Sequence, residues 1–219
     1  MCYRFTIARS DALEALCREL GVAVPPFFPR YNVALSQKTP VVTKRPGTKA
    51  EIAELAFGFK LPARHPGEKP MLMANARSET ILEKPSFRDA VRHRRCLVPA
   101  DGFYEWEKAG AARLPHLFYL KEHRPFFIAG LWQPETAESP AAFALVTTTP
   151  NPLLQSIHDR MPVLLGPNSG PDWLGDEALE PARLAQLCRP LSADLMASHR
   201  VDPRVNNARY EAPDCIVPL

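Results

Sequence analysis

The run RCLVPADGFYEW (Arg95–Trp106) contains two segments with the residue pattern of β-strands, Cys96–Pro99 and Gly102–Glu107. Other strand-like runs flank it on both sides. They are Tyr3–Ile7, Tyr31–Ala34, Thr39–Val42, a stretch beginning at Ile52, His116–Leu120, Phe126–Leu131 and Phe143–Thr148. Strands this short and this numerous are typical of a curved sheet with frequent turns.

Helical spacing is confined to a few short segments. The first has Asp11 at its predicted N-cap and Gly21 at its end, and shorter helices are expected after Ser86 and over Pro152–Ile157 and Pro181–Cys188. The strands do not alternate with helices as in βαβ units. The sequence therefore predicts an α+β fold, in which a largely antiparallel curved sheet carries a few peripheral helices, and a single domain spanning residues 1–219.

Composition sets limits on the class of protein. The 219 residues include 27 Lys and Arg against 24 Asp and Glu, a net charge of +3, so any nucleic-acid surface must be local. Proline is about twice its usual ~5%, with 24 residues against only 10 glycines. These values exclude a histone-like polycation and a disordered chain, and they predict a folded protein with many fixed turns.

The five cysteines are scattered and form no CxxC pair, which argues against a disulfide framework, a zinc ribbon or a redox pair. The six histidines do not fall at metal-ligand spacing, and no nucleotide-binding motif is present. We therefore expect chemistry without a metal or cofactor. No secretory signal or membrane-spanning run is found, so we expect a cytoplasmic protein.

Cys2 is the first candidate for chemistry. Removal of Met1 would leave Cys2 with a free α-amine, of pKa about 7.7–8.0, beside a thiol of pKa about 8.5. An amine and a thiol on adjacent carbons can trap an aldehyde, because the amine forms an imine and the thiol then closes a five-membered thiazolidine ring. The alternative is that Cys2 is simply a frayed terminal residue.

Two further residues could move protons. Glu105 lies among aromatic residues on a predicted strand, and burial there would raise its pKa. A carboxylate facing water on an alternating strand is the other interpretation. His158 follows a predicted helix and precedes an apolar run, a position that suits a catalytic or a surface-loop histidine equally well.

Polar and basic segments suggest contacts to nucleic acid. Asn75 and Arg77 follow an apolar run, and could hold a substrate through an amide and a phosphate through a guanidinium, or could belong to a helix cap. The arginines of Arg88–Arg95 could follow a nucleic-acid backbone or form a solvated helix face. Pro40, Phe57 and Trp106 could stack on bases, although core packing is the alternative.

Taken in order, these segments resemble the SRAP family, the SOS-response-associated peptidases that include abasic-site processing proteins. The similarity runs through nearly the whole chain. It rests on Met1-Cys2-x-Arg4-Phe5, Arg30–Ala34, Asn75–Thr80, Arg95–Trp106, Thr147–Pro150, His158–Pro162 and the segment from Val205 to Cys215.

The resemblance implies a barrel-like sheet that holds single-stranded DNA in a positive groove. It also implies that the N-terminal cysteine forms a thiazolidine crosslink with the ring-opened abasic sugar. Carried over residue by residue, it makes Cys2 the nucleophile, Asn75 its positioning residue, Glu105 the acid/base group and His158 a second catalytic group. Arg4, Arg77 and Arg160 match positions that contact phosphate.

Three departures from the family pattern concern the surroundings of these residues. Tyr3 stands where glycine is usual, and strand alternation places its side chain with Phe5 and Ile7, away from Cys2. Leu35 and Ser36 replace a Pro-Thr pair, and Phe57 or Phe59 replaces a tryptophan. We expect these changes to alter the shape of the DNA groove and to leave the catalytic residues in place.

Two other functions remain open from the sequence. One is a cysteine peptidase of the N-terminal-nucleophile type, including self-cleavage before Cys2. The other is a non-catalytic module that binds single-stranded DNA. For the leading function, the expected partner is single-stranded DNA containing abasic sites, bound by a monomer that associates with the nucleoid.

Overall fold

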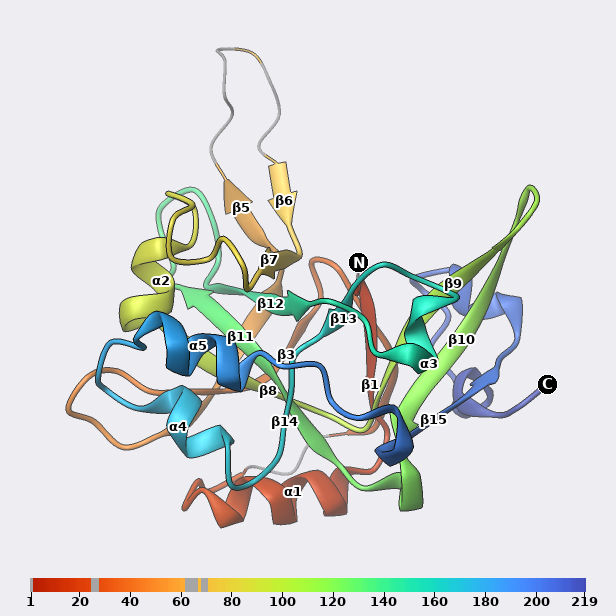
Figure 1. Cartoon of the computed structure of the whole chain (residues 1–219), viewed down its shortest axis with the longest axis horizontal. Coiled ribbons are helices and arrows are strands. Elements are labelled where there is room, and N and C mark those ends of the chain that lie inside the picture. Colours follow the sequence, from red (N-terminus) through yellow and green to blue (C-terminus); the bar gives the residue numbers. More distant parts are fainter. Residues whose placement is uncertain (1, 25–27, 62–66, 68–70) are drawn as a thin grey trace.

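A computed structural model describes residues 2–24, 28–61, 67 and 71–219. Its centre is a closed barrel of five strands, in which β12 pairs with β4, the order continues β4-β3-β8-β11, and β11 pairs back with β12 (Figure 1). The strands are β3 (Lys38–Thr43), β4 (Glu51–Phe57), β8 (Arg95–Ala100), β11 (Phe126–Gln133) and β12 (Ala142–Thr148). Only the β4–β12 pair is parallel. The predicted α+β, barrel-like class is confirmed.

A second, fully antiparallel sheet packs against the barrel. Its order is β15-β10-β9-β1-β2. The strands are β1 (Arg4–Ile7), β2 (Arg30–Ala34), β9 (Gly102–Ala109), β10 (Ala112–Leu120) and β15 (Met196–Arg200). The far ends of β9 and β10 extend away from the body as a hairpin arm (Figure 1).

Shorter strands complete the framework. β7 (Asn75–Arg77) lies parallel to β12, β13 (Met161–Pro162) pairs with the same strand, and β14 (Leu164–Leu165) pairs with β11. β5 (Phe59–Leu61) and β6 (Met71–Met73) form a two-stranded ribbon that leads into β7. Residues 75–77 form a strand, so Asn75 and Arg77 belong to the sheet and not to a helix cap, and the polar residues 78–80 that follow lie in a turn.

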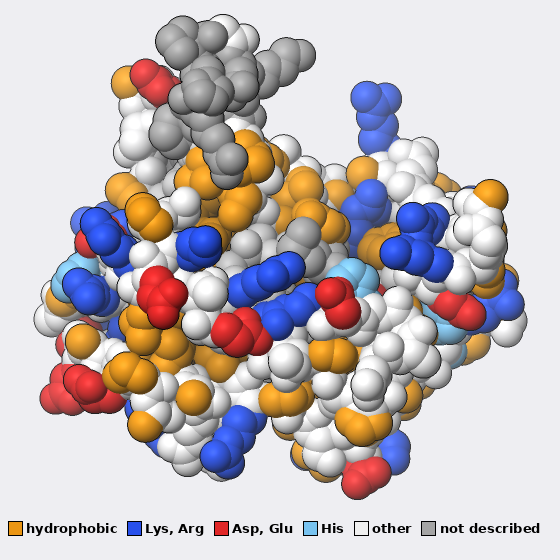
Figure 2. Space-filling model, turned by 45° about the horizontal axis from the view of Figure 1, so that its top comes forward, with side chains coloured by type: hydrophobic (Ala, Val, Ile, Leu, Met, Phe, Trp, Pro, Cys, Tyr) orange, Lys and Arg blue, Asp and Glu red, His pale blue; other side chains and the backbone are white. Residues whose placement is uncertain are grey.

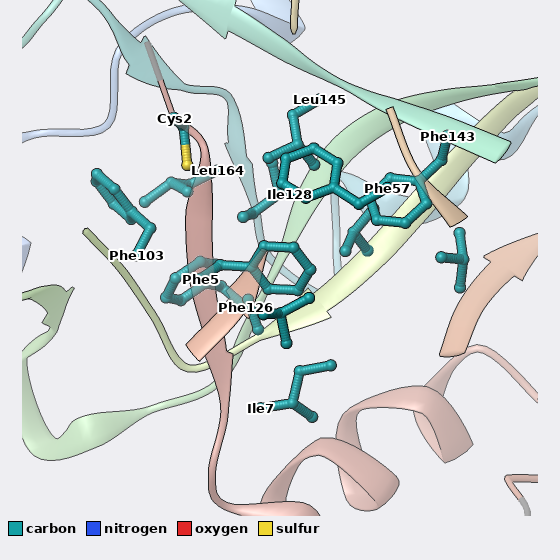
Figure 3. Packing of buried hydrophobic residues seen from close by; sticks show 14 of the residues in the cluster. Cys2, Phe5, Ile7, Phe57, Phe103, Phe126, Ile128, Phe143, Leu145 and Leu164 are labelled. Carbon is teal, nitrogen blue, oxygen red and sulfur yellow. The ribbon is translucent and has the colours of Figure 1, made fainter. Parts of the chain in front are cut away.

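Alternation along the barrel strands separates two cores. On β11, Ile128 faces the inner cluster between barrel and second sheet, whereas Phe127 faces an outer cluster. On β12, Phe143 faces inward and Val146 outward in the same way. Figure 3 shows the inner cluster, to which β1 contributes Phe5 and Ile7. Burial on both faces explains why these strands are almost continuously apolar.

Helices cover the outer cluster. They are α1 (Ser10–Glu19), α2 (Arg88–His93), α4 (Gly170–Leu174) and α5 (Pro181–Leu187), and α3 (Pro152–Gln155) leads toward His158. The 3-10 turns are η1 (Lys121–His123), η2 (Ala193–Leu195), η3 (Pro203–Asn206) and η4 (Pro213–Ile216). No helix in the described part of the chain is long and apolar enough to span a membrane.

The sequence predicted the C-terminal end of α1 correctly but not its N-cap. The helix stops just before Gly21, which terminates it as expected: Gly21 has a φ of +70° and its N–H donates to Arg18 O at 2.9 Å, while Val22 N–H donates to Cys17 O. Asp11 is not the N-cap. The helix begins at Ser10 without a side-chain cap, so Asp11 lies in the first turn, where its charge still favours the helix dipole.

The basic run at Arg88–Arg95 does not form one solvated face. Only Arg88 and Arg92 belong to α2, and Arg95 is buried in β8. Its guanidinium donates to the carbonyl oxygens of Trp173 at 2.5 Å, Val91 at 2.7 Å and Glu177 at 2.8 Å. Arg95 therefore holds α2 and α4 against the barrel and is not available to a nucleic-acid backbone.

A buried corner joins the barrel to the second sheet between β8 and β9. The Asp101 carboxylate accepts hydrogen bonds from Thr6 Oγ1 and from the Arg9 backbone N–H. A Cβ on the next residue, Gly102, would lie 2.9 Å from Leu117 Cδ1 and 3.0 Å from Thr6 Oγ1. Close packing favours glycine here, and the corner positions β9, which carries Glu105.

Candidate active site around Cys2

Cys2 is held inside the protein immediately before β1. Its side chain is only 1% exposed and belongs to the inner cluster with Phe103 and Leu164 (Figure 3). The Sγ donates to Arg4 O at 3.5 Å. The terminal segment is thus not frayed, and the side chain of Tyr3 is 37% exposed. Tyr3 lies outside β1 and does not share the buried face of Phe5, which corrects the predicted alternation, although it does point away from the buried surroundings of Cys2.

Asn75, the first residue of β7, lies beside Cys2. Its Nδ2 donates to Cys2 O at 3.1 Å. Its Oδ1 is buried and accepts no hydrogen bond from the described residues. A buried acceptor without a partner is costly, so this amide is suited to receive a donor from a ligand or from a rearranged terminus.

Glu105 is a buried carboxylate, not a solvent-facing one. It is 2% exposed on β9, and burial raises its pKa to about 7, although the positive charge of the chain's N-terminus acts to lower that pKa. Burial also raises the pKa of the Cys2 thiol, and the charge of Glu105 raises it further. The thiol and this carboxyl group therefore interact electrostatically. A carboxyl group with a pKa near 7 can both donate and accept a proton at neutral pH.

His158 follows α3, and its backbone N–H donates to Leu154 O at 2.9 Å. Burial lowers the pKa of its imidazole, aided by the positive charge of the chain's N-terminus, which favours the neutral ring. Nδ1 accepts the Arg160 backbone N–H at 3.0 Å. This contact favours the neutral ring with its proton on Nε2, whereas the carboxylate of Asp159, whose Oδ1 lies 2.9 Å from Nδ1, favours a proton on Nδ1.

Arg160 is bound to the protein on the same loop. Its two terminal nitrogens donate to the two carboxylate oxygens of Glu79 at 2.7 and 2.8 Å, and one of them also donates to Thr147 O at 2.7 Å. Partial burial acts to raise the pKa of Glu79, but the hydrogen bonds from Arg160 outweigh it and lower that pKa below its ordinary value. Sequence reasoning assigned no role to Glu79, although it lies only two residues after Arg77.

The family model described as SOS response associated peptidase (SRAP) matches residues 1–208. The chain belongs to the SRAP family. The resemblance drawn from the short motifs is thereby confirmed.

Relatives and solved structures agree with this SRAP assignment. The chain is 34% identical over 222 residues to the abasic site processing protein YoqW of Bacillus subtilis, with 99% of each chain covered. It is 30% identical over 234 residues to the abasic site processing protein YedK of Escherichia coli, with both chains fully covered. A phage-related protein from Bordetella bronchiseptica has a TM-score of 0.73 at 27% identity, covering 97% of this chain and 100% of the other. A protein from Bacteroides thetaiotaomicron shares the fold, with a TM-score of 0.82 at 23% identity over the whole of both chains.

The remaining candidate residues of the SRAP chain differ in their availability. Arg77 is exposed at the end of β7. Arg4 is half-buried and donates to Asn32 Oδ1 at 2.9 Å and Val205 O at 2.8 Å, so it connects β1 to the C-terminal segment. Pro40 is buried within β3, opposite Glu54. Arg77 is thus the arginine best placed for an external anion.

The surface around the site has mixed charge. Figure 2 views the end of the molecule that carries β5, β6 and the N-terminus, and shows Lys and Arg side chains scattered with Asp and Glu around hydrophobic side chains. This pattern agrees with the net charge of +3. A pocket of about 460 Å³ next to α1 is lined by none of Cys2, Asn75, Glu105 and His158. Within the described residues, no cluster of three or more His, Cys, Asp and Glu side chains is arranged to hold a metal ion.

Proposed function

We propose that this SRAP protein processes abasic sites in single-stranded DNA by forming a covalent thiazolidine crosslink through Cys2. The relatives YoqW and YedK are named abasic site processing proteins. The observation that carries the proposal is the placement of Cys2, whose backbone is held by Asn75 and whose buried thiol interacts with the charge of Glu105. The proposal requires removal of Met1, so that Cys2 presents both an amine and a thiol.

The chemistry is a condensation in two stages. The α-amine of Cys2 adds to the aldehyde carbon of the ring-opened sugar, and the resulting carbinolamine loses water to form an imine. The thiol then adds to the same carbon, so that a C–S bond forms while the thiol proton moves to the imine nitrogen. One water is released for each thiazolidine formed, and no oxidant, reductant or cofactor is needed.

Glu105 serves both stages. In its protonated form it gives a proton to the departing hydroxyl of the carbinolamine. As a carboxylate it then takes the proton from the thiol and returns it to nitrogen. Because burial raises the pKa of Glu105 to about 7, both forms are populated near neutral pH. The thiol, whose pKa is raised by burial and by Glu105, reacts with the help of this base instead of as a free thiolate.

His158 and Arg77 complete the proposed site. The neutral imidazole of His158, with its proton on Nε2, is suited to donate to the sugar oxygen released when the abasic ring opens. Arg77 is exposed next to Asn75 and supplies a cation for the neighbouring phosphate. Arg4, Arg160 and Pro40 would act through the shape of the site, given their contacts within the protein.

Single-stranded DNA is favoured by the depth of the site. The sugar must reach a thiol that is only 1% exposed, so the abasic nucleotide has to leave the stacked strand. Extruding a nucleotide costs a few kcal/mol in a duplex and least where no partner strand holds it. Specificity then depends on the aldehyde, which undamaged DNA lacks.

The direct test combines intact mass with adduct formation. Protein lacking Met1 is mixed with an oligonucleotide that contains one abasic site, and the products are separated in SDS. We expect a stable adduct whose mass equals protein plus DNA minus one water, absent with Cys2→Ser and with an undamaged oligonucleotide. No adduct from protein with a proven Cys2 terminus would reject the proposal. Equal non-covalent binding to both oligonucleotides without an adduct would indicate a plain DNA-binding module.

A peptidase is the second candidate, because the description of the matching family contains that term. The same Cys2 thiol, assisted by Glu105, would then attack an amide carbonyl. The distinguishing measurement is turnover of a peptide substrate by protein that has already lost Met1. Sustained release of product, abolished by Cys2→Ser, would favour the peptidase.

A further inference from the structure

Glu79 and Arg160 connect the two segments that carry the candidate catalytic residues. Glu79 follows β7, which holds Asn75, and Arg160 is two residues beyond His158. The pair is bidentate, with both N–O distances below 2.9 Å. A fork-shaped contact of this kind fixes the relative orientation of two segments better than a single hydrogen bond does.

Thr147 on β12 anchors both segments from the other side. Its carbonyl oxygen accepts the Arg160 side chain at 2.7 Å and the backbone N–H of Ser78 at 2.9 Å. The β7 turn and the His158 loop are therefore tied to one barrel strand and to each other.

The ion pair also sets the backbone of Arg160, whose N–H donates to His158 Nδ1 at 3.0 Å. That hydrogen bond favours the tautomer with Nδ1 unprotonated and the proton on Nε2, and it competes with the Asp159 carboxylate, whose Oδ1 lies 2.9 Å from Nδ1 and favours a proton there. A shift of the Arg160 backbone would release the ring and change its tautomer. Glu79 thus acts on His158 indirectly: Glu79 binds the Arg160 side chain, and the Arg160 backbone binds the His158 ring.

We propose that Glu79 is a positioning residue that holds His158 and Asn75 in register for the crosslinking reaction. The inference rests on the proposed function. It also changes the role of Arg160, whose charge is compensated by Glu79 and whose buried terminal nitrogens bind within the protein. Arg160 and Glu79 together form a clamp between the two segments, and Arg77 supplies the exposed positive charge.

A competing view is that Glu79 is only an acidic side chain near the DNA. The two views predict opposite effects of its removal. A carboxylate beside a polyanion weakens binding, so its neutralisation alone would tighten DNA binding and speed the reaction at low DNA concentration. Loss of a clamp would instead slow the maximal rate, because the reacting groups would be less well aligned.

The experiment measures crosslinking rate against concentration of an abasic oligonucleotide for wild type, Glu79→Gln and Glu79→Asp, all lacking Met1. Glu83→Gln is the matched control, since Glu83 is an exposed carboxylate four residues on that lines the same groove of about 600 Å³. We expect Glu79→Gln to lower the maximal rate roughly 10- to 100-fold with little change in the half-saturating DNA concentration. Glu79→Asp, which keeps the carboxylate, should recover part of the rate, and Glu83→Gln should behave as wild type.

A second readout reports on His158 itself. The ¹⁵N shifts of its ring should show Nδ1 as the unprotonated nitrogen in wild type and in Glu83→Gln, and a mixture of tautomers in Glu79→Gln. An unchanged maximal rate in Glu79→Gln, or a faster reaction through tighter binding, would overturn the inference. Unaltered His158 shifts in a slow Glu79→Gln would do the same. If wild type itself forms no adduct, the proposed function fails instead. Should Glu79→Gln fail to fold, Glu79→Asp alone decides by its rate and its ring shifts.

Discussion

The side-chain amide of Asn75 donates a hydrogen bond to the backbone carbonyl of Cys2 over 3.1 Å. The side chain of Asn75 on β7 therefore orients the backbone of Cys2. It leaves the thiol and the amine of Cys2 for the proposed chemistry. The buried Oδ1 of the same amide can still accept a hydrogen bond. This contact defines the site more directly than the surface charge does.

Loss of the Asn75 amide should slow crosslinking without unfolding the protein. We expect Asn75→Ala to reduce the maximal rate about 10- to 100-fold, since the Cys2 backbone would lose its orientation. Asn75→Asp should be at least as slow, because a carboxylate would face the Cys2 carbonyl. Single-turnover kinetics measure the rate, and thermal melting controls for folding. A wild-type rate in Asn75→Ala would contradict this role.

The pKa of Glu105 predicts opposite effects of its removal on stability and on rate. In the folded protein the pKa is about 7, against 4.5 for an ordinary glutamate, so the folded state binds the proton more tightly. This contribution favours folding below pH 4.5 and is lost as the pH rises through 7. Relative to wild type, Glu105→Gln should gain about 3 kcal/mol of stability between pH 4 and pH 8. Urea unfolding at both pH values measures it.

The same substitution should nearly abolish crosslinking at pH 7, because Gln cannot exchange protons. The wild-type rate should change with an apparent pKa near 7, absent in Glu105→Gln. A stability difference that does not vary with pH would mean that Glu105 titrates normally.

Arg77 should account for part of the salt dependence of DNA binding. Each phosphate contact to single-stranded DNA contributes about 0.7 to the slope of log K against log salt. We expect Arg77→Gln to reduce the slope by roughly that amount for abasic and intact oligonucleotides alike. Lys121→Gln, which removes an exposed cation in η1 beside the start of α1, is the control and should leave the slope unchanged. Equal slopes for Arg77→Gln and wild type would mean that Arg77 does not contact a phosphate of the DNA.

A side chain at Gly102 should destabilise the protein. A Cβ there would meet Leu117 at 2.9 Å and the backbone oxygen of Phe118 at 3.2 Å, so Gly102→Ala should cost about 1–3 kcal/mol. Gly166→Ala is the matched control, since nothing lies within 4 Å of its Cβ position. Denaturant unfolding compares the two. A neutral Gly102→Ala would show that the corner between β8 and β9 can relax.

Arg95 should contribute to the stability of the fold and not to DNA binding. Arg95→Met would leave buried carbonyl oxygens of Trp173 and Val91 without donors, at a cost of about 3 kcal/mol or more. Arg92→Met, on the exposed side of α2, should change stability by less than about 0.5 kcal/mol. A DNA-binding defect with normal stability in Arg95→Met would contradict the assignment.

Local pattern was a good guide to the strands but a poorer one to charged side chains. The runs in β8, β9, β11 and β12 were predictable, because two-sided burial leaves long apolar segments in the sequence. The buried position of Glu105 was one of two open interpretations. The burial of Arg95 matched neither of its two open interpretations, a nucleic-acid contact or a solvated helix face, and the contact of Arg4 with Val205 O was not predicted, since nothing next to either residue in sequence reveals the carbonyl oxygens that bind them.

By itself the sequence determined the α+β class and the barrel strands, because periodicity is a local property, and through its short motifs it proposed the set Cys2, Asn75, Glu105 and His158. Only the tertiary structure decided that β12 closes the barrel against both β4 and β11, and that Glu79 joins Arg160 across 81 residues of chain. The physical reason is that such pairings depend on burial and distance between segments remote in sequence. Burial raises the pKa of Glu105, and the short distance to Glu79 compensates the charge of Arg160. A linear sequence pattern contains neither burial nor distance.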